Sequence, residues 1–137
     1  MAYWLVKSEP SSYSWDQMVK DGRTFWSGVR NFQASANLKA MKKGDHAFFY
    51  HSGEEKAVVG IIEIIKEYYP DHTDESGKFG MVDVKTIGPV KTPVTLAAIK
   101  AEPKLKNLAL IRQSRLSVVP IDDASWRLIC GMAGVKP

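Results

Sequence analysis

The residues best suited to hold a ligand lie within one short segment. Residues 26–31 read WSGVRN and combine an indole, a guanidinium and a carboxamide around a glycine, in what the sequence predicts to be a loop. Tryptophan offers a flat face for stacking, asparagine can read an edge of donors and acceptors, and arginine presents a fixed fork to an anion. The set suits a planar ligand with hydrogen-bonding edges. The alternative interpretation is a buried Trp26 beside an ordinary surface Arg30.

Two other segments are candidate partners of this loop. They are residues 7–10 (KSEP) and residues 50–52 (YHS), each at the end of a predicted strand. Of the adjacent Tyr68 and Tyr69, strand alternation turns one inward, and the other could line a groove. Asn31 has a second candidate role, because its side chain is also placed to cap the helix predicted after it.

The sequence contains neither a glycine-rich phosphate loop nor a Gly-x-Ser-x-Gly motif, two common signatures of catalytic and cofactor sites. His46 and His51 are five residues apart on one predicted strand and therefore face opposite ways, so we expect no metal site. His51 and Ser52 also face opposite ways, which separates a base from a nucleophile. Glu9 and Asp71 could act as acid and base only if folding brings them together, and Glu9 is otherwise a surface charge.

Composition indicates one folded domain that spans residues 1–137. Of the 137 residues, 45% are hydrophobic and 25% are charged, which is enough for a core and too apolar for a disordered chain. No apolar run approaches the roughly 20 residues of a membrane span, and the N-terminus does not resemble a signal peptide. Cys130 is the only cysteine, so no internal disulfide can form. We therefore expect a cytoplasmic protein with no membrane partner, no metal and no cofactor; the sequence does not indicate its oligomeric state.

The net charge of +4 gathers at the two ends of the chain. Residues 1–60 carry 8 basic and 6 acidic residues, residues 61–100 carry 5 and 6, and residues 101–137 carry 6 and 3. A fold that brought the ends together would form a basic face that favours a polyanionic partner. The alternative is an ordinary surface of mixed charge.

Hydrophobic patterns and helix caps predict short strands interspersed with short helices. Strands are expected at residues 3–7, 47–50, 57–65, 81–90 and 116–120, and helices at 14–21, 31–41, 95–100 and 122–134. Within the second helix, Phe32, Leu38 and Met41 are expected to form the apolar side. Gly60 predicts a bulge or a close approach, and residues 68–73 are expected to break their strand. Without long crossover helices, the pattern favours an α+β fold with a small, strongly curved sheet and helices outside it.

Taken together, these motifs closely resemble the EVE domain family, a branch of the PUA-like superfamily. The matching segments, in the same order, are residues 3–10, 26–31, 41–45, 49–52, 69–71, 93–96 and 115–118. The family usually has Tyr-Gln-Ala-Arg-Asn after Arg-Asn, whereas this chain has residues 32–36 (FQASA), so a basic side chain is missing at Ser35. The resemblance implies a PUA-like β pseudobarrel with short helices packed around it.

The resemblance also implies a binding function without catalysis. A related domain, YTH, holds a methylated adenine of RNA in an aromatic cage, and the resemblance implies that EVE domains read modified cytosine in DNA in a similar pocket. It implies that Trp26 stacks on a flipped base. The residues expected to contact the nucleic acid or shape the pocket are Lys7, Ser8, Trp26, Ser27, Arg30, Asn31, Tyr50, His51, Ser52, Tyr69, Pro70, Asp71 and Arg115.

Within this set, the roles are divided by chemistry. Ser8, Asn31 and Ser52 would contact the edge of the base. The walls would include Tyr50, Tyr69 and Pro70, and Arg30 and Arg115 would hold phosphate or orient the pocket. Three alternatives stay open: an RNA reader of YTH or PUA type, an enzyme that acts on a nucleotide or small molecule through Glu9, His51 or Asp71, and a protein-interaction module.

Overall fold

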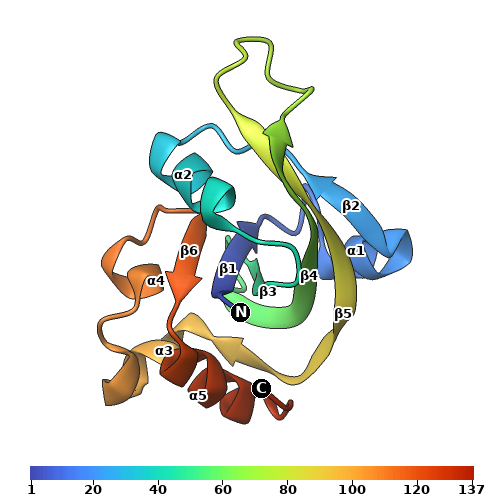
Figure 1. Ribbon diagram of the computed structural model, residues 1–137. Coiled ribbons are helices and arrows are strands. Elements are labelled where there is room, and N and C mark those ends of the chain that lie inside the picture. Colours follow the sequence, from blue (N-terminus) through green and yellow to red (C-terminus); the bar gives the residue numbers. More distant parts are fainter.

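One mixed sheet of six strands, in the order β2-β5-β4-β3-β1-β6, forms the centre of the computed structural model, which describes residues 1–137 (Figure 1). The elements in chain order are β1 (Tyr3–Ser8), α1 (Trp15–Asp21), β2 (Arg23–Trp26), α2 (Phe32–Ala40), β3 (His46–His51), β4 (Ala57–Pro70), β5 (Gly80–Thr95), α3 (Leu96–Ala101), the 3-10 helix η1 (Pro103–Leu105), α4 (Ala109–Arg112), β6 (Val118–Ile121) and α5 (Asp123–Ala133). The expected α+β class is confirmed.

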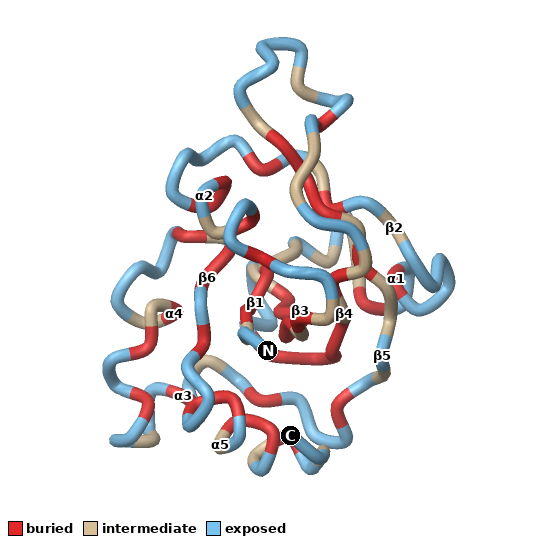
Figure 2. The backbone as a smooth tube through the Cα atoms, viewed as in Figure 1, coloured by how far each residue is buried: buried red, intermediate tan, exposed pale blue.

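The parallel pair of β1 and β3 brings two of the predicted partner segments together. Lys7 pairs with Tyr50 and Ser8 with His51, so the two strands end side by side. Beyond these ends the Ser52 amide donates to the Ser8 carbonyl over 2.9 Å. Because β1 and β3 are apolar along most of their length, they lie in the core, and their polar ends mark its boundary (Figure 2).

The longest strands, β4 and β5, curve the sheet. They pair antiparallel over most of their length with four register shifts, one of them between Val58 and Gly60. The bulge and close approach expected at Gly60 are both confirmed, since the Trp15 ring packs directly on its Cα. In Figure 1, β5 bends around the lower edge of the molecule, and the β4–β5 loop projects at the top.

Two expectations about strand ends were wrong. Residues 68–70 do not break β4, which continues to Pro70; proline is tolerated there because it is the last residue before the hairpin loop. Trp26 does not lie in a loop but ends β2, where it pairs with Val82 of β5. The loop proper begins at Ser27.

Helix caps follow the sequence closely. The side chains of Ser14, Asn31, Thr95 and Asp122 each accept a hydrogen bond from the backbone amide three residues on, as expected of N-caps. Phe32 is the exception to the predicted packing of α2: its side chain is 69% exposed and stacks on Phe79 of the β4–β5 loop, while Leu38 and Met41 are buried. No helix is both long and apolar enough to cross a membrane.

Helix α5 closes the core against the inner face of the sheet. Its Trp126 is stacked between Phe48 of β3 and Tyr3 of β1, with ring centroids 3.9 and 4.4 Å apart. The packing anchors the strands at the end opposite to Lys7 and Ser8. The polar strand ends are therefore held by a rigid core and remain open to solvent on their other side.

Candidate functional site

A cleft of about 540 Å³ opens where β1 and β2 end. We call it the first cleft. Its walls come from the end of β1 and the turn after it, from β2, from the loop after β2, and from the start of β6. The residues that line it are Lys7, Ser8, Glu9, Ser12, Tyr13, Thr24, Phe25, Trp26, Ser27, Gly28, Val29, Arg30 and Ser117.

Trp26 forms an aromatic wall of this cleft. Its indole is 9% exposed and meets Phe49 and Tyr13 edge-on, with ring centroids 5.6 and 6.4 Å apart. Two perpendicular aromatic contacts hold the indole in one orientation. Trp26 is thus mostly buried and rigid, yet it still borders an open cavity.

The loop after Trp26 is fixed by a single buried carboxylate, that of Asp71. One oxygen accepts hydrogen bonds from the Gly28 amide (2.9 Å) and from Nη1 of Arg30 (3.0 Å). The other oxygen accepts from the Thr73 amide (2.7 Å) and the Thr73 hydroxyl (2.6 Å). Asp71 therefore ties the rim of the first cleft to the β4–β5 loop without entering the cleft.

Arg30 also links the loop after β2 to the β4–β5 loop. Its Nη2 donates to the Thr73 hydroxyl over 3.0 Å, and its guanidinium lies over the Phe79 ring, 5.8 Å from the centroid. With Nη1 bonded to Asp71, both terminal nitrogens are engaged. Of the two roles expected for Arg30, the geometry favours orienting the pocket.

The environment of Asp71 also sets its acidity. Burial alone would raise its pKa, but hydrogen bonds from Thr73, Gly28 and Arg30 stabilise the charged form and hold the pKa of this carboxyl well below its ordinary value of 3.8. The native protein therefore binds this proton less readily than the unfolded chain does. Asp71 adds stability at pH values above the ordinary pKa, and that stability is lost as pH falls toward the native value.

This sign gives a test in acid. Between roughly pH 5 and pH 2, the free energy of unfolding of the wild-type protein should fall more steeply than that of the Asp71→Asn variant, which has no carboxyl to protonate. Denaturant titrations at a series of pH values measure both curves. Parallel curves would show that Asp71 titrates alike in the folded and unfolded chains.

The first cleft contains polar groups that are free to bind. The side chains of Ser12 and Ser27 have no hydrogen-bond partner within the protein, whereas the Ser8 hydroxyl donates to the Tyr13 carbonyl over 2.5 Å. Glu9 is exposed and is the single carboxylate in the lining. An aromatic wall with hydroxyl and carboxylate groups around it suits a planar molecule that offers hydrogen-bond donors.

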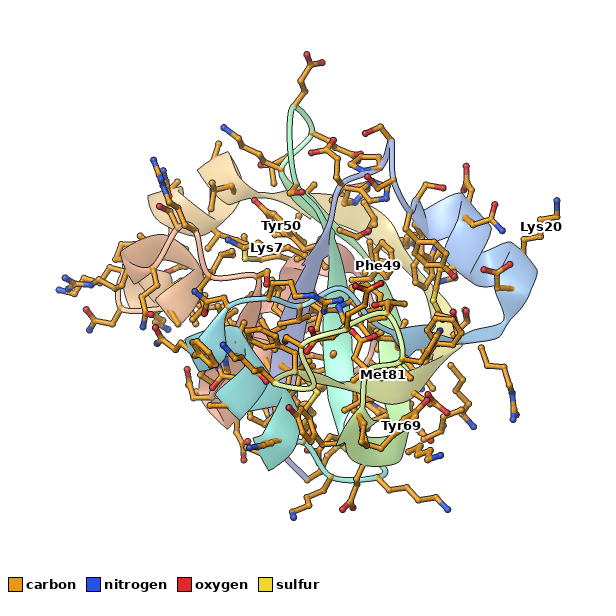
Figure 3. All side chains as sticks on the ribbon, turned by 90° about the horizontal axis from the view of Figure 1, so that it is seen from above. Lys7, Lys20, Phe49, Tyr50, Tyr69 and Met81 are labelled. Carbon is orange, nitrogen blue, oxygen red and sulfur yellow. The ribbon has the colours of Figure 1, made fainter.

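A second cleft of about 470 Å³ adjoins the first and shares Lys7 and Ser117 with it. Lys7 donates from Nζ to the Ser114 carbonyl over 2.8 Å and lies over the Tyr50 ring, so it stands between the two clefts. Figure 3 shows Lys7 and Tyr50 next to each other. Burial lowers the pKa of Lys7.

Comparison with known proteins identifies the family. The model of the EVE domain matches residues 2–132. The chain belongs to the EVE domain family. A solution structure of a Rhodopseudomonas palustris protein is 58% identical, with a TM-score of 0.92 and coverage of 98% of this chain and 94% of that one. Human THYN1, crystallised in complex with DNA that contains 5-methylcytosine, is 32% identical over 100% of both chains, with a TM-score of 0.92.

A more distant likeness concerns the fold alone. The YTH domain of a Zygosaccharomyces rouxii protein is 15% identical, with a TM-score of 0.60 and coverage of 99% of this chain and 88% of that one. The expected likeness of the fold to that of a YTH domain is thereby confirmed.

Nine of the thirteen predicted site residues line one or more of three neighbouring clefts. Lys7, Ser8, Trp26, Ser27 and Arg30 line the first cleft. The second cleft is bordered by Lys7, Tyr50, Ser52 and Arg115, and a third, of about 350 Å³, by Asn31 and Arg115. Asn31 uses its side-chain oxygen to cap α2 by accepting from the Ala34 amide over 2.9 Å, which leaves its amide nitrogen free.

Tyr69 and Pro70 are not brought to any of these clefts. Figure 3 shows Tyr69 well apart from Lys7 and Tyr50. Its hydroxyl donates to Asp83, and burial together with that carboxylate raises the pKa of Tyr69 to about 12. Lys66 covers the ring, 3.9 Å from the centroid. The continued strand pairs Tyr69 with Met81, next to Val82, the partner of Trp26, but the side chain of Tyr69 reaches Asp83 and not the first cleft.

His51 is a structural residue of this EVE domain. Its Nε2 accepts from the Trp15 amide over 2.9 Å, so the ring proton is on Nδ1, which donates to Glu55 over 2.7 Å. The imidazole thereby fixes the start of α1. His46 lies at the other end of β3 and contacts Glu63, and the protein has no group of three or more His, Cys, Asp or Glu side chains that could hold a metal ion.

Sequence reasoning missed the aromatic partner of Trp26. Tyr13 lines the first cleft and meets the indole at an interplanar angle of 88°. A signal was present, because Ser14 was a clear N-cap and the residue before a cap often packs against neighbouring apolar groups. Ser12, Thr24 and Phe25 were also missed as lining residues, whereas Glu9 belongs to the predicted partner segment of residues 7–10.

Proposed function

We propose that this protein is a nucleic-acid-binding module that reads a modified cytosine in DNA, held in the first cleft against Trp26. The observation that carries the proposal is the rigid, partly open indole beside free hydroxyls and one carboxylate. Human THYN1, which aligns with this protein over the full length of both chains, was crystallised with DNA that contains 5-methylcytosine. A cavity of this size also lies within the range of roughly 300–1,000 Å³ usual for ligand sites.

The polar groups that line the first cleft suit cytosine better than thymine. Cytosine presents an amino group where thymine presents a carbonyl oxygen, and a carboxylate accepts a hydrogen bond only from the amino group. Glu9 could serve as that acceptor, with Ser12 and Ser27 as adaptable partners for the rest of the edge.

Magnitudes indicate how the affinity must arise. Extruding a base costs a few kcal/mol, stacking on one aromatic ring returns about 1–3 kcal/mol, and a buried methyl group adds about 0.8 kcal/mol. These contributions nearly cancel. Most of the net affinity must therefore come from cationic side chains on phosphates and should decrease as salt increases.

The test is a titration at fixed salt with oligonucleotides that differ at one base. Comparing 5-methylcytosine with cytosine isolates the methyl group. Comparing 5-methylcytosine with thymine, which also carries the methyl, tests the hydrogen-bonding edge formed by N3 and the group at position 4. We expect binding about fourfold tighter for 5-methylcytosine than for cytosine, from one buried methyl group, and weaker binding of thymine. Equal affinity for all three strands would refute the proposal, and preference for the matching RNA strand would indicate an RNA reader instead.

Two substitutions of Trp26 test the stacking wall. Trp26→Leu keeps an apolar side chain but has no ring, and should lose at least about fivefold in affinity for the modified strand because stacking is absent. Trp26→Phe keeps a ring and should retain most of that affinity. Equal losses in the two variants, with both folded by thermal unfolding, would show that the ring does not stack on the base.

The proposal includes no catalysis. Of the three candidate acid–base residues, His51 and Asp71 are fully engaged in hydrogen bonds that hold α1 and the cleft rim. Neither lines the first cleft. Glu9 alone remains, and no second carboxylate and no histidine lines the first cleft beside it.

A further inference from the structure

The second cleft has a composition unlike that of the first. Four cationic side chains line it, those of Lys7, Lys56, Lys100 and Arg115, and the lining has no acidic residue; one carboxylate, that of Glu9, lies against the lining residue Gly53. Lys56, Lys100 and Arg115 take part in none of the protein's four salt bridges. Like charges gathered around a concave surface repel one another and create a positive potential that an anion relieves.

The second cleft is poorly suited to a base. The Tyr50 ring in its floor is only 2% exposed and is covered by Lys7, so it offers no free face for stacking. Leu96 and Leu110 are the remaining apolar lining residues. The available chemistry is that of ammonium and guanidinium groups, which bind phosphate oxygens.

The two clefts are neighbours with Lys7 between them. They share Lys7 and Ser117, and Arg115 leads on from the second cleft to the third. Any nucleotide whose base entered the first cleft would carry phosphates on its 5′ and 3′ sides. The second cleft lies next to the first, where one of these flanking phosphates would be.

The backbone of Lys56 supports a role for its side chain. Lys56 is the only residue other than glycine with a positive φ, at 48°, in the turn between β3 and β4. Glycine or asparagine is the usual choice for that conformation. A lysine here directs an exposed ammonium group to the second cleft at a cost in backbone strain.

We propose that the second cleft binds phosphodiester groups of the strand that presents its base to the first cleft, with Lys56 and Lys100 as the principal contacts. The inference rests on the proposed function for the identity of the ligand. It adds a direction to it: the strand leaves the first cleft past Lys7 toward β3 and α3, and not past Arg30 toward the β4–β5 loop.

The first experiment measures salt dependence. In Lys56→Gln/Lys100→Gln, affinity for modified and unmodified single strands should fall by the same factor, roughly tenfold at 0.1 M salt, and the slope of log affinity against log salt should decrease by about 1.4. The matched control is Lys20→Gln/Lys42→Gln, which removes the same charge. Neither control lysine lines the second cleft. Lys20 lies at the edge of the molecule in Figure 3, and Lys42 comes just before the start of β3, whereas Tyr50 is near the end of that strand.

A second experiment tests for direct contact. Neutral methylphosphonate linkages are placed one at a time on either side of the modified base. At the contacted linkage, the substitution should weaken wild-type binding but have little further effect on the double variant, because the two changes remove one interaction. Additive losses at every linkage, or a double variant with the affinity and slope of its control, would overturn the inference.

These outcomes separate the inference from the proposed function. A lysine effect with no preference for the modified base would support the phosphate site and refute the base reader. A preference for the modified base with no lysine effect would support the base reader and refute the phosphate site. Absence of binding to any oligonucleotide would refute both.

Discussion

Asparagine in place of Asp71 should lower the free energy of unfolding by roughly 3 kcal/mol and weaken binding of modified DNA by at least about tenfold. The side chain of Asp71 is fully buried and accepts four hydrogen bonds. Asparagine has nearly the same shape, so the substitution changes hydrogen bonding and charge and leaves packing intact.

The size of the effect follows from the arrangement of donors. Each carboxylate oxygen of Asp71 faces two donors, one pair on Gly28 and Arg30 and the other on Thr73. If the asparagine amide group faces Gly28 and Arg30, it opposes two N–H donors. If it faces Thr73, it opposes the Thr73 amide, and the Thr73 hydroxyl must turn from donor to acceptor. In either position at least one hydrogen bond is lost and a buried donor is left unpaired, which costs more than removing a neutral pair.

The effect on binding follows from where those donors lie. Gly28 and Arg30 form the rim of the first cleft, so their release loosens the cleft rather than the core. Chemical denaturation and oligonucleotide titration measure the two effects separately. Glu75→Gln, in the same loop, is the matched control because Glu75 is exposed and makes no hydrogen bond or salt bridge. If Asp71→Asn behaves like this control in both assays, Asp71 does not hold the rim.

Local signals in the sequence were sufficient to predict much of the fold. N-caps at Ser14, Asn31, Thr95 and Asp122 and the strand at residues 3–7 depend on a few adjacent residues, and the structure confirms them. Residues 7–10 and 50–52 were both predicted to be partners of the Trp26 loop. Residues 7–9 line the first cleft with Trp26, whereas Tyr50 and Ser52 line the second cleft. The lack of long crossover helices predicted a small, strongly curved sheet, and the family resemblance added the expectation of a pseudobarrel.

The errors share a cause, because each depends on contacts made across the chain. Pro70 would end a central strand, but here the strand is about to turn, and its partner Gly80 gives no side chain to oppose it. Phe32 fits the apolar side of α2 by periodicity, yet Phe79 from the hairpin loop draws it to the surface. Neither loop geometry nor hairpin length can be read from the residues themselves.

The function of Asp71 illustrates the same limit at the site. Residue type and family motif predicted that Asp71 belongs to the site, and the structure places it behind the rim, bonded to Gly28 and Arg30. A carboxylate that contacts a ligand and one that supports the residues around it have the same appearance in a sequence. The hydrogen bond between Arg30 and Asp71, which are 41 residues apart in the chain, forms only when the chain folds. It is this contact that shows Asp71 to be a supporting carboxylate.

A methyl group added at Gly60 should be nearly as damaging as the loss of the Asp71 charge. Alanine at this position would place its Cβ under 3.0 Å from three atoms of the six-membered ring of Trp15, so the indole must move. Trp15 packs on Phe49, with centroids 5.2 Å apart, and Phe49 packs on Trp26. We expect Gly60→Ala to lower the free energy of unfolding by roughly 3 kcal/mol, since overpacking a rigid core has few routes of relief.

Because the disturbed rings end at Trp26, the same substitution should also weaken binding in the first cleft, although Gly60 does not line it. Gly88→Ala is the matched control. Gly88 lies in β5, in the same antiparallel ladder opposite Ile61, and an added Cβ there meets nothing within 4 Å. Alanine is favoured over glycine in a strand interior, so this control should be neutral or slightly stabilising. Equal unfolding midpoints for the two variants would mean that Trp15 can shift freely, and the indole wall of the first cleft would then owe its orientation to Tyr13 rather than to the packed rings beneath it.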